Sequence, residues 1–122
     1  MNYENLTEVD IFEKGLNDPD FNYYKGLDAL LEKDETGICT YRAGRDWKTF
    51  DYKKGLDGLF EKDRTGYWVY WSGLDWKTFD YKKGLKHLLK IKSEYLQRAL
   101  NHWEVSGIKL SNEEVLEFIN LI

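Results

Sequence analysis

A tandem repeat is the feature of this sequence that most constrains its fold. Residues 50–78 repeat residues 21–49 with 18 of 29 positions identical and without a gap. A third copy opens with the heptapeptide FDYKKGL at residues 79–85 and then diverges. We call the offset from residue 21 to residue 50 one period. Periods of about 20–50 residues are typical of stacked supersecondary units, each of which buries a face against its neighbours. The sequence therefore predicts a tandem array that presents surfaces.

The first half of each copy has the spacing of an amphipathic helix. Apolar side chains recur at offsets of 0, 4, 7 and 8 in all three copies. They are Tyr23, Leu27, Leu30 and Leu31, then Tyr52, Leu56, Leu59 and Phe60, then Tyr81, Leu85, Leu88 and Leu89. We expect the helix to start in the Phe-Asp-Tyr segment, with Asp51 or Asp80 as N-cap. Gly26, Gly55 and Gly84 recur at its beginning and indicate either this start or a close backbone approach.

The second half of the copy is ambiguous until the third copy is compared. Residues 65–71, TGYWVYW, are rich in the β-branched and aromatic residues that are typical of a strand. A shift of one period aligns Leu96, Ala99, Leu100 and Trp103 with Tyr67, Tyr70, Trp71 and Leu74. These are the offsets of a helical face, so we predict a helix and keep a β-containing repeat as the alternative. Asp63, Thr65 and, in the third copy, Ser93 are the expected caps, and Gly44 and Gly73 indicate a tight helix crossing.

The predicted fold class is all-α, a short α-solenoid of about three helix-pair repeats in one domain, 1–122. Its parts are an N-terminal element at 1–20, repeats at 21–49, 50–78 and 79–107, and a capping helix at 108–122. The segment FEKGL at 12–16 echoes the Lys-Gly-Leu motif, as an atypical end unit would. In the last helix Ser111 and Glu114 have the spacing of a capping box. Its apolar face is Val115, Phe118, Ile119 and Ile122.

The composition indicates a protein of a reducing compartment. The chain has one cysteine, Cys39, and its first residues lack the basic start and apolar core of a signal peptide. No apolar run approaches the ~20 residues of a membrane span. We therefore expect a cytoplasmic protein with no membrane association. The formal charge is −4, but residues 1–49 carry 6 basic and 11 acidic side chains, whereas residues 79–107 carry 6 basic and 3 acidic ones.

Residues 32–49, EKDETGICTYRAGRDWKT, and residues 61–78, EKDRTGYWVYWSGLDWKT, resemble the short degenerate helix-pair repeats of bacterial and phage proteins. These repeats are similar in plan to HEAT-like arrays but have shorter units. The resemblance covers residues 21–107 and rests on period and pattern. It implies an α-solenoid scaffold that binds a macromolecule. The sequence does not match the ankyrin or tetratricopeptide consensus, so no functional residue is carried over from those families.

The sequence contains no recognised active site, and we expect a non-enzymatic protein without cofactor or metal. His87 and His102 have no Cys or carboxylate at a repeated metal-ligand spacing. Cys39 corresponds to Trp68 in the next copy, which favours a small packing residue over a nucleophile. The glycines follow the repeat, and no phosphate-binding loop is present in the sequence.

The candidate protein-binding residues come from two features. The inter-repeat segment at 46–54 alternates aromatic and cationic residues and is copied unchanged at 75–83; it either binds a partner or packs one unit on the next. Trp71 and Leu74 replace Arg42 and Arg45, so one helical face changes from cationic to apolar, as either a binding surface or a polar end cap would. The candidate set is Arg42, Arg45, Trp47, Trp68, Trp71 and Trp76.

These features predict a protein-binding inhibitor or adaptor. Within that class we favour a phage or mobile-element inhibitor of a bacterial nuclease or defence complex, of the anti-CRISPR type, because the acidic first half could occupy a nucleic-acid groove. The alternative in the same class is an antitoxin or immunity protein that neutralises a cognate toxin. A nucleic-acid binder is the alternative from another class. Its residues would be Lys82, Lys83, Lys86, Lys90, Lys92 and Arg98. The sequence leaves the oligomeric state open.

Overall fold

The computed structural model describes residues 3–103, 111–114 and 116 of the 122-residue chain. Residues 3–103 contain seven helices, and residues 112–114 and 116 are helical as well. No strand occurs in these described residues, so the fold is all-helical and the strand alternative for residues 65–71 is wrong. The helices are α1 (Glu8–Asn17), α2 (Tyr23–Lys33), α3 (Ile38–Asp46), α4 (Tyr52–Lys62), α5 (Tyr67–Asp75), α6 (Tyr81–Lys90) and α7 (Leu96–His102).

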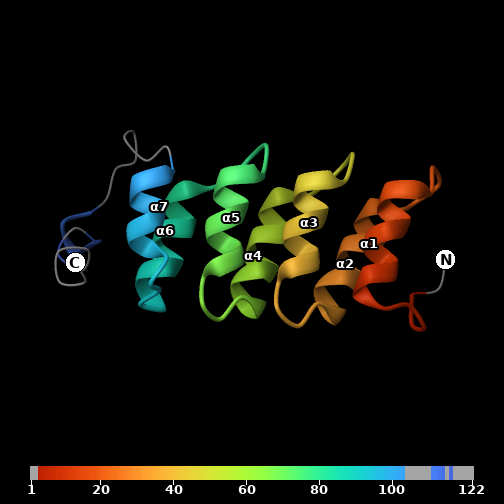
Figure 1. The fold of residues 1–122 in the computed structure, drawn as a ribbon, viewed down its shortest axis with the longest axis horizontal. Helices are drawn as coiled ribbons and strands as arrows, with labels where there is room; N and C mark the ends of the chain where they lie inside the picture. The colour runs from red at the N-terminus through yellow and green to blue at the C-terminus, as the bar shows by residue number, and fades with distance from the viewer. Residues whose placement is uncertain (1–2, 104–110, 115, 117–122) are drawn as a thin grey trace.

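The helices are arranged in two rows (Figure 1). α1, α3, α5 and α7 lie side by side in the first row, and each contacts the next. α2, α4 and α6 form the second row, in which α2 contacts α4. Between α4 and α6 the ring of Phe60 stacks on the ring of His87, with 4.1 Å between the ring centroids. Consecutive helices also contact each other, so each row covers an apolar face of the other.

The first helix of each copy begins where the sequence predicts. Asn22, Asp51 and Asp80 are the N-caps of α2, α4 and α6. Each side chain accepts a hydrogen bond of 3.1 Å from the backbone N–H three residues further on. The predicted caps Asp51 and Asp80 are therefore confirmed. The leucines of the predicted stripe are buried at Leu27, Leu30, Leu56, Leu59, Leu85, Leu88 and Leu89.

The glycine early in each of these helices touches a phenylalanine ring from the preceding turn. A Cβ atom at any of the three glycines would collide with that ring. The pairs are Phe21 with Gly26, Phe50 with Gly55, and Phe79 with Gly84. The glycine thus marks both the helix start and a close approach, and the approaching group is a side chain rather than a backbone.

The second helix of each full copy begins at a glycine in the left-handed conformation. Gly37 precedes α3 with φ of 96°, and Gly66 precedes α5 with φ of 86°. Neither residue has a side chain to cap the helix. The acceptors are instead Asp34 and Asp63, three residues upstream, which each take a hydrogen bond of 2.8 Å from the N–H of the third helical residue. Asp63 therefore bonds the helix terminus as predicted, but from outside the N-cap position.

Two predicted caps are corrected. The hydroxyl of Thr65 accepts a hydrogen bond of 3.3 Å from the N–H of Tyr67, the first residue of α5, while Gly66 holds the N-cap position. Ser93 accepts from the N–H of Tyr95 at 3.1 Å, and Tyr95 is the N-cap of α7. The hydroxyl of Thr65 therefore bonds the first N–H of α5 from the turn before it, and that of Ser93 bonds the N–H of an N-cap residue, so neither residue holds the predicted N-cap position.

A tryptophan after each second helix packs on the second helix of the preceding copy. Its indole N–H donates a hydrogen bond of 2.9 to 3.0 Å to a backbone carbonyl. These bonds run from Trp47 to Phe12, from Trp76 to Tyr41 and from Trp103 to Tyr70. The rings lie over Gly15, Gly44 and Gly73, where a Cβ atom would collide with them. The tight crossing predicted at Gly44 and Gly73 is therefore a contact between a helix backbone and an indole ring.

These contacts correct the alignment of the third copy. The sequence comparison placed Trp103 on Leu74, but Trp103 takes the structural place of Trp76, which is less than one full period before it. Ala99 likewise corresponds to Ser72, because the carbonyl of each accepts the backbone N–H of the following tryptophan. The third copy is thus two residues shorter before α7. The helix prediction survives because the offsets 0, 3, 4 and 7 describe a helical face in either alignment.

The N-terminal element is corrected in the same way. The segment at 12–16 echoes the Lys-Gly-Leu motif of the first helices, yet α1 corresponds to a second helix. Gly15 lies one period before Gly44 and meets Trp47 as Gly44 meets Trp76. Lys33 of α2 contacts the chain before α1, because its ammonium group donates a hydrogen bond of 3.0 Å to the carbonyl of Glu4. The element is therefore the second half of an incomplete copy.

The predicted capping helix is described only in part. Ser111 and Glu114 form the predicted capping box, with side-chain hydrogen bonds of 3.2 Å and 2.9 Å to each other's backbone N–H groups. Glu114 also makes an ion pair of 3.3 Å with Lys86 of α6. The predicted apolar face of Val115, Phe118, Ile119 and Ile122 lies outside the described residues, as do residues 104–110 of the third repeat and the linker.

Candidate protein-binding surface

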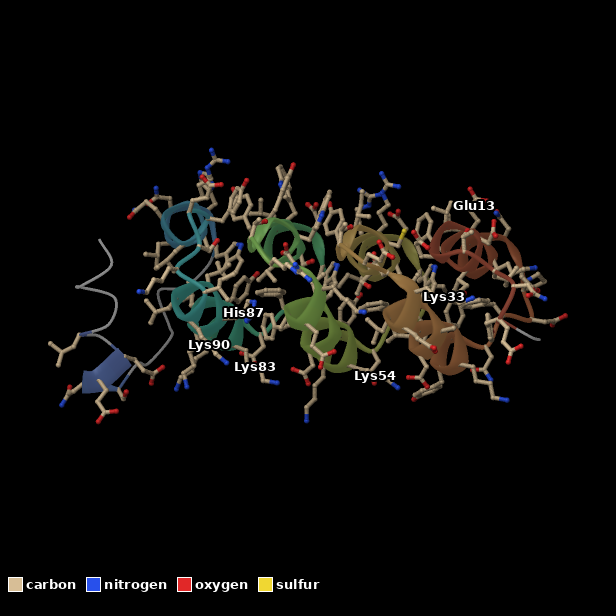
Figure 2. All side chains as sticks on the ribbon, turned by 90° about the horizontal axis from the view of Figure 1, so that it is seen from below. Glu13, Lys33, Lys54, Lys83, His87 and Lys90 are labelled. Carbon is tan, nitrogen blue, oxygen red and sulfur yellow. The ribbon has the colours of Figure 1, made fainter. Side chains whose placement is uncertain are left out.

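The four helices of the first row expose one equivalent position each. The residues are Glu13 on α1, Arg42 on α3, Trp71 on α5 and Arg98 on α7, and all four are exposed. Glu13, Arg42 and Trp71 are one full period apart. Arg98 follows Trp71 by two residues less than a period, because the third copy is two residues shorter before α7. Figure 2 shows Glu13 on one side of the molecule, with Lys54, Lys83 and Lys90 on the opposite side. We call the exposed side of α1, α3, α5 and α7 the outer face.

A second set of equivalent positions lies one turn further along the same helices. It consists of Leu16, Arg45, Leu74 and Asn101, all of them exposed. Leu74 has a relative exposure of 38% and Trp71 one of 36%, so α5 presents apolar area at both levels. Arg42 and Arg45 are cationic at the same levels on the neighbouring α3. The predicted change from a cationic to an apolar face is therefore located on exposed positions.

The N-terminal end of α5 adds a cluster of stacked aromatic rings. The rings of Tyr67 and Trp68 are stacked at 4.7 Å, and Tyr67 also stacks on Tyr95 of the third copy at 5.4 Å. Trp68 in turn lies 5.1 Å from the ring of Tyr41 on α3. The guanidinium of Arg98 lies 5.3 Å from the centroid of Tyr95. The rings pack against each other, which holds Trp68 and Tyr67 in place at a half-buried depth.

A polar network joins α3 to α5 beside this cluster. The hydroxyl of Tyr41 donates to the carboxylate of Asp75, and Arg45 makes two hydrogen bonds of 2.7 and 2.8 Å with Asp46. Burial, followed by the hydrogen bond to Asp75, raises the pKa of Tyr41, so the phenol is protonated at neutral pH. Arg45 is already paired with Asp46, whereas among the described residues no such ion pair engages Arg42, the other exposed arginine of α3.

Two members of the predicted binding set do not belong to the outer face. Trp47 and Trp76 have relative exposures of 4% and 5% and fill the space between copies. Trp76 contacts Phe50 and Phe79 edge to face, at centroid distances of 5.1 and 6.2 Å. Of the two interpretations of the inter-repeat segment, packing of one unit on the next therefore applies to Trp47 and Trp76. Their assignment to a binding surface is corrected, because an indole buried in this way presents no area to a partner.

The basic residues of the alternative site are divided between the two rows. Lys82, Lys86 and Lys90 share one exposed face of α6, whereas Arg98 lies on α7 in the other row. Lys83 forms an ion pair of 3.0 Å with Asp57 of α4, and Lys86 forms the pair with Glu114. The exposed Lys92 follows α6 in the turn. The structure therefore brings three lysines of the predicted six onto one helix face.

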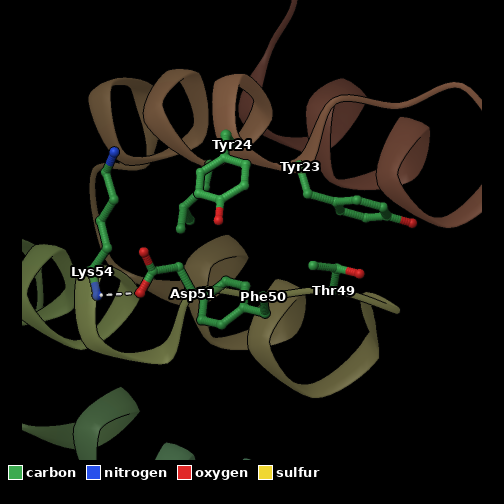
Figure 3. A pocket seen from close by; sticks show the side chains of 7 residues that line it. Tyr23, Tyr24, Thr49, Phe50, Asp51 and Lys54 are labelled. Atoms are coloured by element: carbon green, nitrogen blue, oxygen red, sulfur yellow. Dashed lines mark hydrogen bonds between the residues drawn. The ribbon is translucent and has the colours of Figure 1, made fainter.

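A shallow pocket lies between α2 and α4 (Figure 3). Its volume is about 150 Å³, and its floor is apolar. Its charged groups are engaged within the protein, because Asp51 accepts from the N–H of Lys54 and the ammonium group of Lys54 pairs with Asp28. The lining is Tyr23, Tyr24, Leu27, Thr49, Phe50, Asp51 and Lys54. A small, half-open pocket whose charged groups pair within the protein is a poor candidate for a small-molecule site.

The remaining residues with potential chemistry have structural surroundings. Cys39 is buried, and burial followed by the nearby Asp34 carboxylate raises its pKa to about 11, so the thiol is protonated at neutral pH. His102 shares a hydrogen bond of 2.6 Å with the hydroxyl of Tyr70. Among the described residues no group of three or more His, Cys, Asp and Glu is placed to hold a metal ion.

His87 makes the stability of the fold depend on pH. Burial, followed by the charge of Lys90, lowers the pKa of His87 below its ordinary value of 6.5. The unfolded chain therefore binds a proton at a pH where the native state does not. The free energy of unfolding should be at its plateau above about pH 6.5 and decrease as the pH falls below that value. Urea unfolding followed by circular dichroism between pH 7.5 and 5.5 measures this slope.

The matched control for this slope is the other histidine of the chain. His87→Phe keeps a ring against Phe60 and should remove the decrease between pH 6.5 and 5.5. His102→Gln removes an exposed histidine and should keep it. An equal slope in wild type and His87→Phe would contradict the assignment.

Comparison with protein-family models, with curated proteins and with solved structures finds no match for this chain. Within the described part of the chain, no helix combines the length and the apolar character that crossing a membrane requires. With no matching protein, the description of the outer face rests on the residues of this chain alone.

Several residues on or beside the outer face were absent from the predicted binding set. Glu13, Leu16, Leu74 and Tyr67 were not in the predicted set, and Arg98 was assigned to the basic alternative. Subtracting one period from Arg42 and Arg45 gives Glu13 and Leu16, so the sequence carried a signal for these two residues. It was hidden because residues 12–16 were matched to the first-helix motif.

Proposed function

We propose that the chain is a short α-solenoid that binds a protein partner through the outer face of α3, α5 and α7, as a non-enzymatic inhibitor or adaptor. The observation that carries the proposal is the distribution of Trp71, Arg42 and Arg98 over one exposed level of three adjacent helices. An apolar centre with cationic neighbours has the composition of a protein-binding hot spot, in which Trp, Tyr and Arg are enriched. The partner surface would present an apolar side chain ringed by carboxylates.

The stacking of the aromatic cluster favours a protein partner over a single-stranded nucleic acid. Bases bind to the free faces of aromatic rings. The faces of Tyr67 are engaged by Trp68 and Tyr95 within the protein. The overall formal charge of −4 also opposes a polyanion.

The face of α6 favours nucleic acid as a second candidate. Lys86 and Lys90 occupy the positions of Asp57 and Glu61 in α4, so the first-helix surface reverses its charge in the third copy. Together with Lys82 these lysines could contact successive phosphates, and such binding must weaken steeply with added salt. A gel-shift titration at low and high salt tests this candidate, and the absence of a shift at low salt would remove it.

The narrower prediction of a phage or mobile-element inhibitor of a nuclease or defence complex remains a proposal. The antitoxin or immunity protein is its alternative, because both use a rigid surface to block an enzyme. Affinity capture from bacterial lysate, followed by inhibition of the captured enzyme in purified form, tests both. Recovery of a nuclease whose activity the chain blocks supports the first, and recovery of a toxin supports the second.

Substitution in the outer face tests the binding surface itself. Trp71→Ala and Arg42→Ala should each weaken binding of the captured partner by about tenfold or more, because hot-spot residues cost more than about 1.4 kcal/mol when truncated. Isothermal titration calorimetry with the purified partner measures the effect. Lys53→Ala, an exposed residue of α4 in the other row, is the control and should bind as wild type. Unchanged affinity of both outer-face variants, with native circular dichroism, would move the surface elsewhere.

A further inference from the structure

The exposed residues of the outer face change in character from α1 to α7. At one level the series is acidic on α1, cationic on α3, aromatic on α5 and cationic on α7. Figure 2 shows these four helices following one another in a nearly straight line. A straight row gives a flat face, and a flat face can be covered by another flat face of the same length. A second copy of this chain has such a face.

Two such faces can stack about a twofold axis in two orientations, and the charges favour one of them. A twofold axis along the row would place every helix on its own counterpart. Arg42 and Arg45 would then meet the same two arginines, and like charges in contact oppose association. A twofold axis parallel to the helices, between α3 and α5, reverses the order of the row. It places α1 on α7 of the second copy and α3 on α5 of the second copy.

The reversed arrangement brings complementary groups together without changing their level. Glu13 comes to lie opposite Arg98 of the second copy, which pairs opposite charges. Arg42 comes to lie opposite Trp71 of the second copy, and a guanidinium over an indole ring is a favourable cation–π contact. Twofold symmetry makes each of these pairs occur twice. All four residues are exposed in the single chain, so all are available for this contact.

We propose that two copies of the chain associate through the outer face in this reversed order, and that the dimer covers the partner-binding surface. The regulatory consequence rests on the proposed function, because Trp71 and Arg42 serve both contacts. Partner binding and self-association then compete, and the chain is released for its partner as its concentration falls. The association itself depends only on the charges and rings of the outer face.

The test measures self-association without any partner. Sedimentation velocity over a range of chain concentrations should show a reversible change from 14.6 kDa to twice that mass. Glu13→Arg should raise the dissociation constant of the dimer by about tenfold or more, because each of its two ion pairs becomes a repulsion. Arg98→Glu should do the same. The double variant should restore the wild-type constant within about threefold. Glu61→Arg, the same charge change on the exposed side of α4, is the control and should leave it unchanged.

Each outcome bears on one proposal only. A monomer at all concentrations overturns the dimer, as does a double variant that associates no better than the single ones. The proposed function survives either result if Trp71→Ala still weakens partner binding as expected above. A dimer that follows the charge exchange, combined with partner binding that ignores Trp71→Ala, leaves the dimer standing and overturns the partner surface.

Discussion

Trp76→Ala is expected to lower the free energy of unfolding by about 3–5 kcal/mol, the range for truncation of a large buried aromatic side chain. The indole is 5% exposed, donates a hydrogen bond of 2.9 Å to Tyr41 and contacts the rings of Phe50 and Phe79. Its removal leaves a cavity between two copies and removes the indole hydrogen bond to the carbonyl of Tyr41. The cavity lies over Gly44, which has no side chain to fill it. Urea unfolding monitored by circular dichroism measures the loss.

Trp71→Ala is the matched control for this prediction. The two residues lie close together in the chain, but Trp71 is 36% exposed and lies on the outer face. Its removal should cost less than about 1 kcal/mol, since surface substitutions rarely cost more. An equal loss in both variants would mean that the indole at position 76 is not a structural centre of the array.

Asp34→Ala is expected to cost about 2–4 kcal/mol, because it leaves several buried donors without an acceptor. Asp34 is 1% exposed and accepts hydrogen bonds from the N–H of Gly37 at 3.2 Å and from both the N–H and the hydroxyl of Thr40 at 2.8 Å. No other acceptor in the described turn is aimed at these groups. The same unfolding measurement applies, and the loss of α3 should be visible as reduced helical ellipticity.

Asp51→Ala separates this effect from ordinary helix capping. Asp51 also bonds a helix N-terminus, with one hydrogen bond of 3.1 Å to the N–H of Lys54, but it is exposed and water can replace it. We expect a cost of about 1 kcal/mol, the usual value for an N-cap. Equal losses for Asp34→Ala and Asp51→Ala would contradict a special role for the buried carboxylate.

The first helices were predictable because their signals are local. The leucine stripe and the caps Asp51 and Asp80 follow from offsets and residue types that any single copy shows. The second helices required a comparison between copies, because the aromatic run in α5 has strand propensity and becomes helical through its packing. The glycine caps Gly37 and Gly66 were missed for a related reason. A Thr-Gly pair allows either residue to begin the helix, and the buried aspartate decides between them.

The candidate binding surface was less predictable, because the exposure of a residue depends on how its copy packs against the neighbouring copy. The sequence shows that Trp47 and Trp71 are both aromatic, but only the glycine under Trp47, Gly15 of the preceding copy, explains why one is interior. Trp71 has no such partner and stays on the outside. The error in aligning Trp103 has the same origin. A two-residue deletion leaves the helical period intact, so the pattern of leucines and alanines could not reveal it.

The recurring bond from an indole to the backbone of the preceding copy also gives the molecule an optical reporter at each junction. Trp47, Trp76 and Trp103 are buried in near-identical surroundings, whereas Trp68 and Trp71 lie nearer the solvent. Changing four of the five tryptophans to phenylalanine would leave fluorescence from a single junction. Three such proteins would record separately when the first, second and third junctions come apart on heating. Coincident transitions would show that the array melts as one cooperative body, and staggered ones that it frays from an end.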